Sequence, residues 1–272
     1  MENKRKRKQK GNPVLIIGAV VLVIVLVIFI QSMVKDRAAA AATQAGIAFL
    51  ESMEAKDPAD VDAVRRELYQ KRLDAQREEL LQQLHSGAMD PFSLFQDYVI
   101  LGDSRAVGFY YMGFLDESRV LATGGATIRD VETHKEKVIA LNPSQIFLCY
   151  GLNDISIGYW DTAEEYVAEY MQVVADLRQK LPNATVVVSS ALPARDPAFA
   201  RSSKWRNIPD WNQVLEETCK ENDVLFVDNS RISEEYADLW DPDGIHVKKE
   251  FYPHWATELI GELLVGGSTD EG

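Results

Sequence analysis

From residue 97 onward, short apolar runs alternate with longer stretches in which apolar residues recur at helical spacing. This alternation is typical of strands joined by crossover helices in a parallel α/β sheet. The predicted strands are Tyr98–Leu101, Arg119–Ala122, Gln145–Tyr150, Thr185–Ser190 and Val224–Val227. The predicted helices cover residues 105–113, 126–138, 162–181, 208–222 and 249–264. We therefore expect a three-layer α/β/α sandwich over residues 95–265, with a five-stranded parallel sheet between the helices.

The N-terminal region follows a different pattern. Val14–Ile30 is an uninterrupted apolar run, and residues 13–34 are long enough to span a bilayer core of ~30 Å at ~1.5 Å per residue. Residues 1–12 form a basic tail, which predicts a cytoplasmic N-terminus and an extracytoplasmic catalytic domain. The alternative is a cleaved signal peptide, but the run exceeds the usual length of such a segment. We expect a single-pass protein of the cell membrane.

Residues 35–90 are rich in helix-forming residues and predict a helical stalk. Asp57-Pro58 resembles an N-cap followed by a first-turn proline, so two helices are expected, over about 36–56 and 58–86. A heptad pattern begins in the second helix but fails at Lys71, which argues against a long coiled coil. Formation of a homo-oligomer through the stalk remains an alternative. The polar, glycine-rich tail at 266–272 is expected to be disordered.

Charge and cysteine content narrow the classes of partner. The net charge is −13, and because residues 1–12 contain six cations and one anion, the rest of the chain carries −18. Such a surface repels phosphate backbones, which argues against nucleic acid as a partner. Cys149 and Cys219 are expected to be isolated buried thiols. The sequence contains no CxxC or HExxH pattern, so we expect neither a metal site nor a cofactor.

Three polar segments follow strands or strand-like runs and supply the groups that acyl transfer requires: residues 102–104, 151–154 and 243–246. Ser104 is a candidate nucleophile, although a serine that opens a helix also serves as an N-cap. His246 is the candidate base, because imidazole titrates near neutral pH. Asp243 lies three residues before it and is placed to fix its tautomer. Asp241 is the second choice for that role.

An attacked ester develops negative charge on its carbonyl oxygen, so hydrogen-bond donors must be in place. The candidates are the backbone N–H groups of Ser104 and Gly125 and the side-chain amide of Asn153. Glycine suits such a position because its backbone can approach a ligand closely. An Asn in a turn, however, often serves only the turn itself.

Together the motifs GDS, GGAT, GLND and DGIH resemble those of the SGNH hydrolases, also called GDSL esterases/lipases, in a membrane-anchored bacterial form. The resemblance covers roughly residues 97–265, with all motifs in the family's order. It implies catalytic or oxyanion-binding roles for Ser104, Gly125, Asn153 and His246, with Asp243 as the triad acid. It also implies a flavodoxin-like sheet with the strand order 2-1-3-4-5. Gly125 fits the family position better than Gly124, and Asp103 and Asp154 would be structural.

One residue departs from the family pattern, which usually has an aliphatic residue after the serine. Here that residue is Arg105, which either binds an anionic substrate group in the cleft or pairs with a carboxylate such as Asp103. Pairing is the interpretation we favour. Tyr159 and Trp160 follow Asn153 and are candidates for a substrate-binding wall, since aromatic rings stack well on sugars.

The leading hypothesis is a membrane-anchored serine esterase that hydrolyses small O-acyl esters, above all acetyl esters, on a cell-envelope glycan. The alternatives are an O-acyltransferase that uses the same triad and a non-catalytic envelope scaffold.

Overall fold

The computed structural model describes residues 13–54 and 58–266, with side chains for residues 31–52 and 62–266. The chain forms two compact units, Met1–Leu73 and Asp74–Gly272. The basic tail predicted at 1–12, the N-cap role of Asp57 and the C-terminal tail from 267 lie outside the described residues.

Within the described part of the N-terminal region, the structure has two helices, α1 (Pro13–Glu54) and α2 (Pro58–His85). The start of α2 at Pro58 agrees with the prediction. Over residues 62–72 the side chains of α2 are mostly exposed. Interactions within the helix, such as the ion pair between Glu67 and Lys71 (2.6 Å), therefore contribute to the stability of α2. Farther along, Leu84 is buried in the core of the second unit, so the end of the predicted stalk is part of that unit.

Where side chains are described, no helix combines the length and the apolar character needed to cross a membrane. The predicted anchor at 13–34 lies mostly outside that part of the chain and stays a prediction.

The second unit contains a five-stranded parallel sheet in the order β2-β1-β3-β4-β5. This is the order that the resemblance implies, and the strands lie where the apolar runs predict them. The strands are β1 (Tyr98–Gly102), β2 (Val120–Ala122), β3 (Gln145–Cys149), β4 (Thr185–Ser189) and β5 (Leu225–Val227). In register, Gly102 pairs with both Ala122 and Cys149, so β1, β2 and β3 end at the same edge of the sheet.

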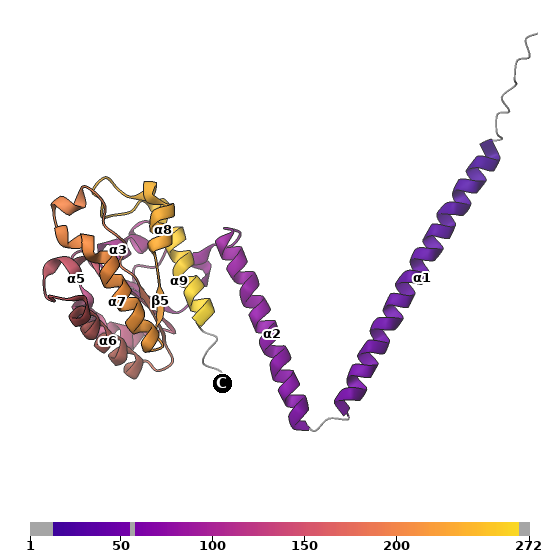
Figure 1. The fold of residues 1–272 in the computed structure, drawn as a ribbon, viewed down its shortest axis with the longest axis horizontal. Coiled ribbons are helices and arrows are strands. Elements are labelled where there is room, and N and C mark those ends of the chain that lie inside the picture. Colours follow the sequence, from indigo (N-terminus) through magenta and orange to yellow (C-terminus); the bar gives the residue numbers. More distant parts are fainter. Residues whose placement is uncertain (1–12, 55–57, 267–272) are drawn as a thin grey trace, which may run out of the picture. The chain divides into compact units, whose positions relative to one another are not determined.

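Helices cover both faces of this sheet (Figure 1). The α-helices are α3 (Ser104–Tyr111), α4 (Val131–Leu141), α5 (Leu152–Ile157), α6 (Ala163–Lys180), α7 (Ile208–Glu221), α8 (Ser230–Glu235) and α9 (Tyr252–Gly266). The 3-10 turns are η1 (Pro91–Leu94), η2 (Ile128–Asp130), η3 (Ala198–Ala200), η4 (Ser203–Asn207), η5 (Ala237–Leu239) and η6 (Lys249–Phe251).

The layers follow from the alternation of side chains along each strand. In β1, Val99 and Leu101 join the core under α4, α6 and α7, whereas Ile100 joins the core under α3 and α9. All three are fully buried, and burial of one such side chain contributes about 1.5–3 kcal/mol. The three-layer sandwich is therefore confirmed.

The helix predicted at 126–138 is shifted in the structure. Oδ2 of Asp130 accepts hydrogen bonds from both N–H and Oγ1 of Thr127 (2.7 and 3.0 Å), and this capping interaction delays the helix start. At the other end, α4 continues to Leu141 because Asn142 adopts the left-handed conformation that ends helices. The short helices α5 and α8 were not predicted, since six residues give too few turns for a periodic signal.

Candidate active site

Ser104 is the first residue of α3, directly after the edge of the sheet. The sharp turn depends on Gly102, where a Cβ would lie 2.5 Å from the Cβ of Ala106 and 2.7 Å from the carbonyl oxygen of Cys149. Asp103 is the N-cap, and its Oδ1 accepts a hydrogen bond from the N–H of Arg105 (2.9 Å). Asp103, and not Ser104, therefore caps α3, which leaves the serine hydroxyl available for other contacts.

His246 contacts that hydroxyl directly. Its Nε2 lies 3.1 Å from Oγ of Ser104, and its Nδ1 lies 2.6 Å from Oδ2 of Asp243. The other carboxylate oxygen of Asp243 accepts hydrogen bonds from the N–H groups of Ile245 (2.8 Å) and His246 (2.9 Å). A serine hydroxyl, an imidazole and a carboxylate are therefore aligned in the order needed for nucleophilic catalysis.

The environment of Asp243 keeps its carboxylate ionised. Burial acts to raise the pKa, but the backbone N–H groups of His246 and Ile245 and the imidazole outweigh it, so the pKa is lowered. Asp241, the alternative acid, instead uses its backbone N–H, which donates to the carbonyl of His246 (2.9 Å). The geometry therefore favours Asp243 over Asp241 as the partner of the imidazole.

The loop that carries Asp243 and His246 is fixed by contacts that sequence reasoning missed. The N–H of Arg195 donates to the carbonyl of Gly244 (2.8 Å), and the Arg195 guanidinium lies 4.3 Å from the ring centre of Trp240 while bonding the carbonyl of Ser233. Gly244 has φ +71°, and a Cβ there would lie 2.3 Å from the carbonyl oxygen of Arg195. No local signal marks Arg195, because its partners are distant in sequence.

The predicted oxyanion donors lie in the loops that follow β2 and β3. Gly125 has φ +84° in a turn closed by the bond from the N–H of Ala126 to the carbonyl of Thr123 (3.2 Å). This conformation favours glycine, and a Cβ there would meet no other protein atom within 4 Å. Asn153 lies in the first turn of α5, and its Nδ2 donates to the carbonyl of Ala126 (2.9 Å). One of its two amide hydrogens therefore ties the loops together, and the other is available to a substrate.

Asp154 holds the same two loops from beneath. It is fully buried, and its carboxylate accepts hydrogen bonds from the N–H groups of Ile128 (2.8 Å) and Gly151 (2.9 Å). Burial raises its pKa to about 7, although both N–H donors oppose that shift. The predicted structural role of Asp154 agrees with these contacts.

The raised pKa of Asp154 gives a pH dependence of stability. Between about pH 4 and pH 7 the folded state retains a proton that the unfolded chain has released, so this group's contribution to the unfolding free energy decreases as pH rises. Asp154→Asn places an amide donor against one of two N–H groups and should cost roughly 1–3 kcal/mol at pH 4.5. The difference in unfolding free energy between the wild-type protein and Asp154→Asn should be smaller at pH 7.5 than at pH 4.5. Denaturant titrations of both proteins at the two pH values will measure it. A disadvantage that is constant with pH would contradict this assignment.

Arg105 does not face a substrate cleft. It is 2% exposed, its Nη1 donates to the carbonyl of Leu192 (2.5 Å), and its Nη2 lies 3.6 Å from Oδ2 of Asp103. Burying a guanidinium without partners is costly, which explains why it is paired. The structure therefore agrees with the pairing of Arg105 with Asp103 and contradicts a substrate-binding role for Arg105.

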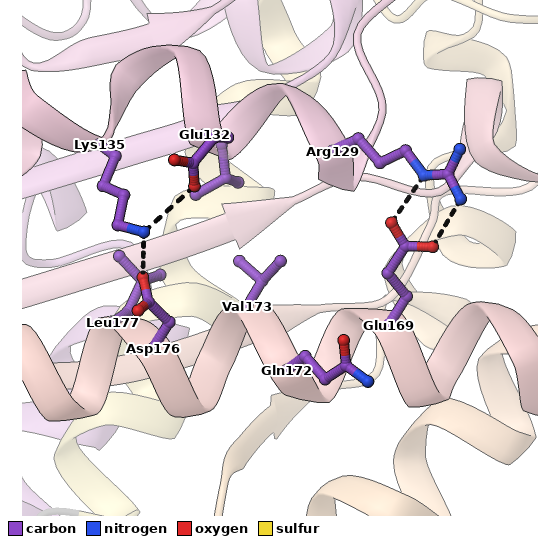
Figure 2. A pocket seen from close by; sticks show the side chains of 9 residues that line it. Arg129, Glu132, Lys135, Glu169, Gln172, Val173, Asp176 and Leu177 are labelled. Atoms are coloured by element: carbon purple, nitrogen blue, oxygen red, sulfur yellow. Dashed lines mark hydrogen bonds and ion pairs between the residues drawn. The ribbon is translucent and has the colours of Figure 1, made fainter.

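The predicted aromatic wall is also only partly realised. Trp160 is 6% exposed within the core under α6, and its Nε1 donates to Oε2 of Glu169 (2.8 Å), so it is a packing residue. Tyr159 is exposed and lies under the guanidinium of Arg129, 4.6 Å from its ring centre. Arg129 in turn pairs with Glu169 (Figure 2). Both residues line a groove between α4 and α6 with a volume of about 370 Å³. Of the two aromatic residues, Tyr159 alone presents a surface to a ligand.

Both cysteines are buried free thiols. Among the described residues, no group of three or more His, Cys, Asp or Glu side chains is arranged to hold a metal ion.

The GDSL-like Lipase/Acylhydrolase family model matches residues 100–252, which is more than half of the chain. The chain belongs to this family. A comparison with curated proteins finds no match. Family membership agrees with the contacts of Ser104 and His246, and the protein is a serine ester hydrolase.

Solved structures show the same fold. A GDSL-like lipase from Bacteroides thetaiotaomicron is 18% identical, with a TM-score of 0.50 over 69% of this chain and 99% of that one. A candidate GDSL-like lipase from Parabacteroides merdae is 20% identical, with a TM-score of 0.50 over 61% and 97% of the two chains. A candidate acylhydrolase from Bacteroides fragilis is 20% identical, with a TM-score of 0.50 over 64% and 89%. At these identities the likeness concerns the fold of the GDSL-like domain.

Proposed function

We propose that this GDSL-family protein is a membrane-anchored, extracytoplasmic serine esterase that removes small O-acyl groups, above all acetyl, from a cell-envelope glycan. The observation that carries the proposal is the unbroken series of contacts from Oγ of Ser104 through the imidazole of His246 to the carboxylate of Asp243. The apolar run and the basic residues before it support the anchor and its orientation.

In the proposed reaction, Nε2 of His246 accepts the proton of Ser104 as Oγ attacks the acyl carbonyl carbon. The carbonyl oxygen becomes an oxyanion that accepts hydrogen bonds from the N–H groups of Ser104 and Gly125 and from the amide of Asn153. His246 then returns the proton to the departing sugar oxygen, which leaves an acyl-enzyme. Water attacks this ester with the same assistance from His246, releasing the carboxylic acid and restoring the serine.

The exposure of the site supports a polymeric substrate. The side chains of His246 and Asp243 are 43% and 37% exposed, so the reacting groups lie near the surface rather than at the end of a closed channel. An acyl group on a bulky glycan reaches such a site without burial of the glycan itself. The predicted position outside the membrane would place cell-envelope polymers within reach of the tethered enzyme.

Release of free acid from acylated glycans tests this proposal. The full chain, solubilised in detergent, is incubated with acetylated cell-wall glycans and short-chain aryl esters, and acetate is measured with and without added acceptor glycan. We expect acetate release, with Ser104→Ala as the inactive control. If acetyl is transferred to the acceptor glycan faster than to water, the protein is an O-acyltransferase and not an esterase. Absence of turnover on every ester would contradict both.

Loss of the Asn153 donor should reduce turnover substantially. Asn153→Ala removes one of three proposed oxyanion donors, and loss of one such donor typically costs about 10²–10³-fold in kcat. KM for a small aryl ester should change little, because the donor acts on charge that develops only in the transition state. Steady-state kinetics on the aryl ester checks the split between kcat and KM. An unchanged kcat would restrict Asn153 to its structural bond with Ala126.

A further inference from the structure

Positive charge is concentrated in one short segment of an otherwise acidic unit. Residues 195–206 contain four basic residues and one acidic residue, whereas residues 95–265 as a whole contain 15 basic and 28 acidic residues. The basic residues of the segment are Arg195, Arg201, Lys204 and Arg206. A local excess of cations on an anionic protein creates a site that attracts negative charge against the field of the remaining surface.

This segment packs between the two loops that carry Asn153 and His246. Nε1 of Trp205 donates to the carbonyl of Leu152 (2.8 Å), next to Asn153. The backbone N–H of Arg195 donates to the carbonyl of Gly244 (2.8 Å), two residues before His246. Trp205 is also buried in one apolar cluster with Leu152 and Ile245. The segment that carries these cations is therefore anchored to the two loops on which Asn153 and His246 lie.

Three of these cations, Arg201, Lys204 and Arg206, are exposed, and we refer to them as the cationic rim. Among the described residues, no carboxylate forms an ion pair with any of them, in contrast to Arg129 and Lys135, which are paired in the groove of Figure 2. Within the rim, Arg206 lies 4.0 Å from the ring centre of Phe199 and Arg201 lies 5.9 Å from that of Trp205. Stacking on a ring leaves the N–H donors of a guanidinium available to an anion.

Lys204 has a structural contact as well. Its Nζ lies 2.9 Å from the position that a Cβ on Gly158 would occupy, at the C-terminal end of α5. A cation there complements the partial negative charge of a helix C-terminus. This position places the ammonium group beside Gly158, which follows the helix that carries Asn153 in its first turn.

We infer that the acylated substrate is anionic, with carboxylate or phosphate groups that bind the cationic rim while the acyl ester lies at Ser104. This inference names the substrate class and rests on the proposed esterase function. Because the rim is exposed, its attraction is screened by salt, with a Debye length of ~10 Å at 0.1 M and ~3 Å at 1 M ionic strength. The preference for an anionic substrate should therefore decrease as salt is added.

Acetate release from matched oligomers tests the inference on the full chain in detergent. The first pair is an O-acetylated oligogalacturonate and the same oligomer with its carboxylates converted to neutral amides. An O-acetylated glycerol phosphate oligomer distinguishes phosphate from carboxylate. At low salt we expect kcat/KM on the preferred anionic oligomer to exceed kcat/KM on the neutral oligomer by about tenfold. This is the lower end of the increase in association rate that electrostatic attraction to a charged site gives. At 1 M NaCl this ratio should approach one.

The triple variant Arg201→Gln, Lys204→Gln, Arg206→Gln should lower the ratio to near one at low salt. The matched control is Lys137→Gln, Lys180→Gln, Lys220→Gln, which removes the same charge from exposed positions on α4, α6 and α7. The control should retain the wild-type ratio. A wild-type ratio of one, or equal ratios in the two triple variants, would overturn the inference while acetate release itself still supports the esterase. Absence of acetate release from all oligomers and aryl esters would instead overturn the proposed function.

Discussion

Ser104→Ala should abolish hydrolysis of 4-nitrophenyl acetate, with kcat reduced by about 10⁴-fold or more, because no other atom replaces Oγ as the nucleophile. The variant retains the N-cap bond from Asp103 to the N–H of Arg105, since alanine at 104 does not alter it. The fold should therefore persist, and turnover is measured by release of 4-nitrophenolate.

The matched control for this substitution is Ser144→Ala. Ser144 is exposed and precedes β3, at the opposite edge of the sheet from Ser104. The Ser144→Ala variant should hydrolyse the ester at the wild-type rate. All five tryptophans lie between residues 160 and 255, so their fluorescence reports the folding of the α/β unit in both variants. A correctly folded Ser104→Ala protein with wild-type turnover would remove the serine mechanism.

Asp243→Asn should lower kcat by about 10⁴-fold, the loss known for the equivalent change in a Ser-His-Asp triad. An amide at this position donates to Nδ1 of His246 instead of accepting from it, so the imidazole is held in the tautomer that presents a hydrogen to Ser104. The substitution also removes the negative charge of Asp243, which stabilises the imidazolium of His246 during the reaction. Kinetics on the aryl ester between pH 5 and pH 9 gives the size of the loss.

Asp241→Asn is the control, because it removes a carboxylate from the same loop without touching the imidazole contact. It should retain most of the wild-type activity, and a greater loss than in Asp243→Asn would show that the acid is misassigned. The lowered pKa of Asp243 also sets the direction of a stability effect. Its contribution is present above the ordinary carboxyl pKa of about 4 and is lost as pH falls through the lowered value.

The sheet was predictable because its strands are buried on both faces and therefore appear as short apolar runs, as in Ile146-Phe147-Leu148. Parallel strands then place the residues after them at one edge, and β1, β2 and β3, which precede Ser104, Gly125 and Asn153, do end at the same edge. The pairing of His246 with Asp243 was predictable because the two lie in one loop. These features depend on local patterns or on a general property of parallel sheets.

The remaining features depend on contacts between distant segments. Trp160 was misjudged because a loop position close to Asn153 gives no information on burial, whereas its bond to Glu169 ties it into the core. The role of Arg195 depends on Trp240 and Gly244, more than forty residues away. The cationic rim is recognisable as a basic stretch in the sequence, but its position beside the site appears only through the contacts of Trp205 and Arg195.

The most direct test of the central claim is covalent labelling of the nucleophile. The full chain is treated with diisopropyl fluorophosphate, which phosphorylates activated serine hydroxyls, and the modified residue is located by peptide mass spectrometry. We expect one adduct, on Ser104, and a loss of esterase activity that is proportional to the fraction of protein labelled. In His246→Ala the adduct should form far more slowly. An active protein in which Ser104 remains unmodified, or labelling that is equally fast without the imidazole, would contradict the account.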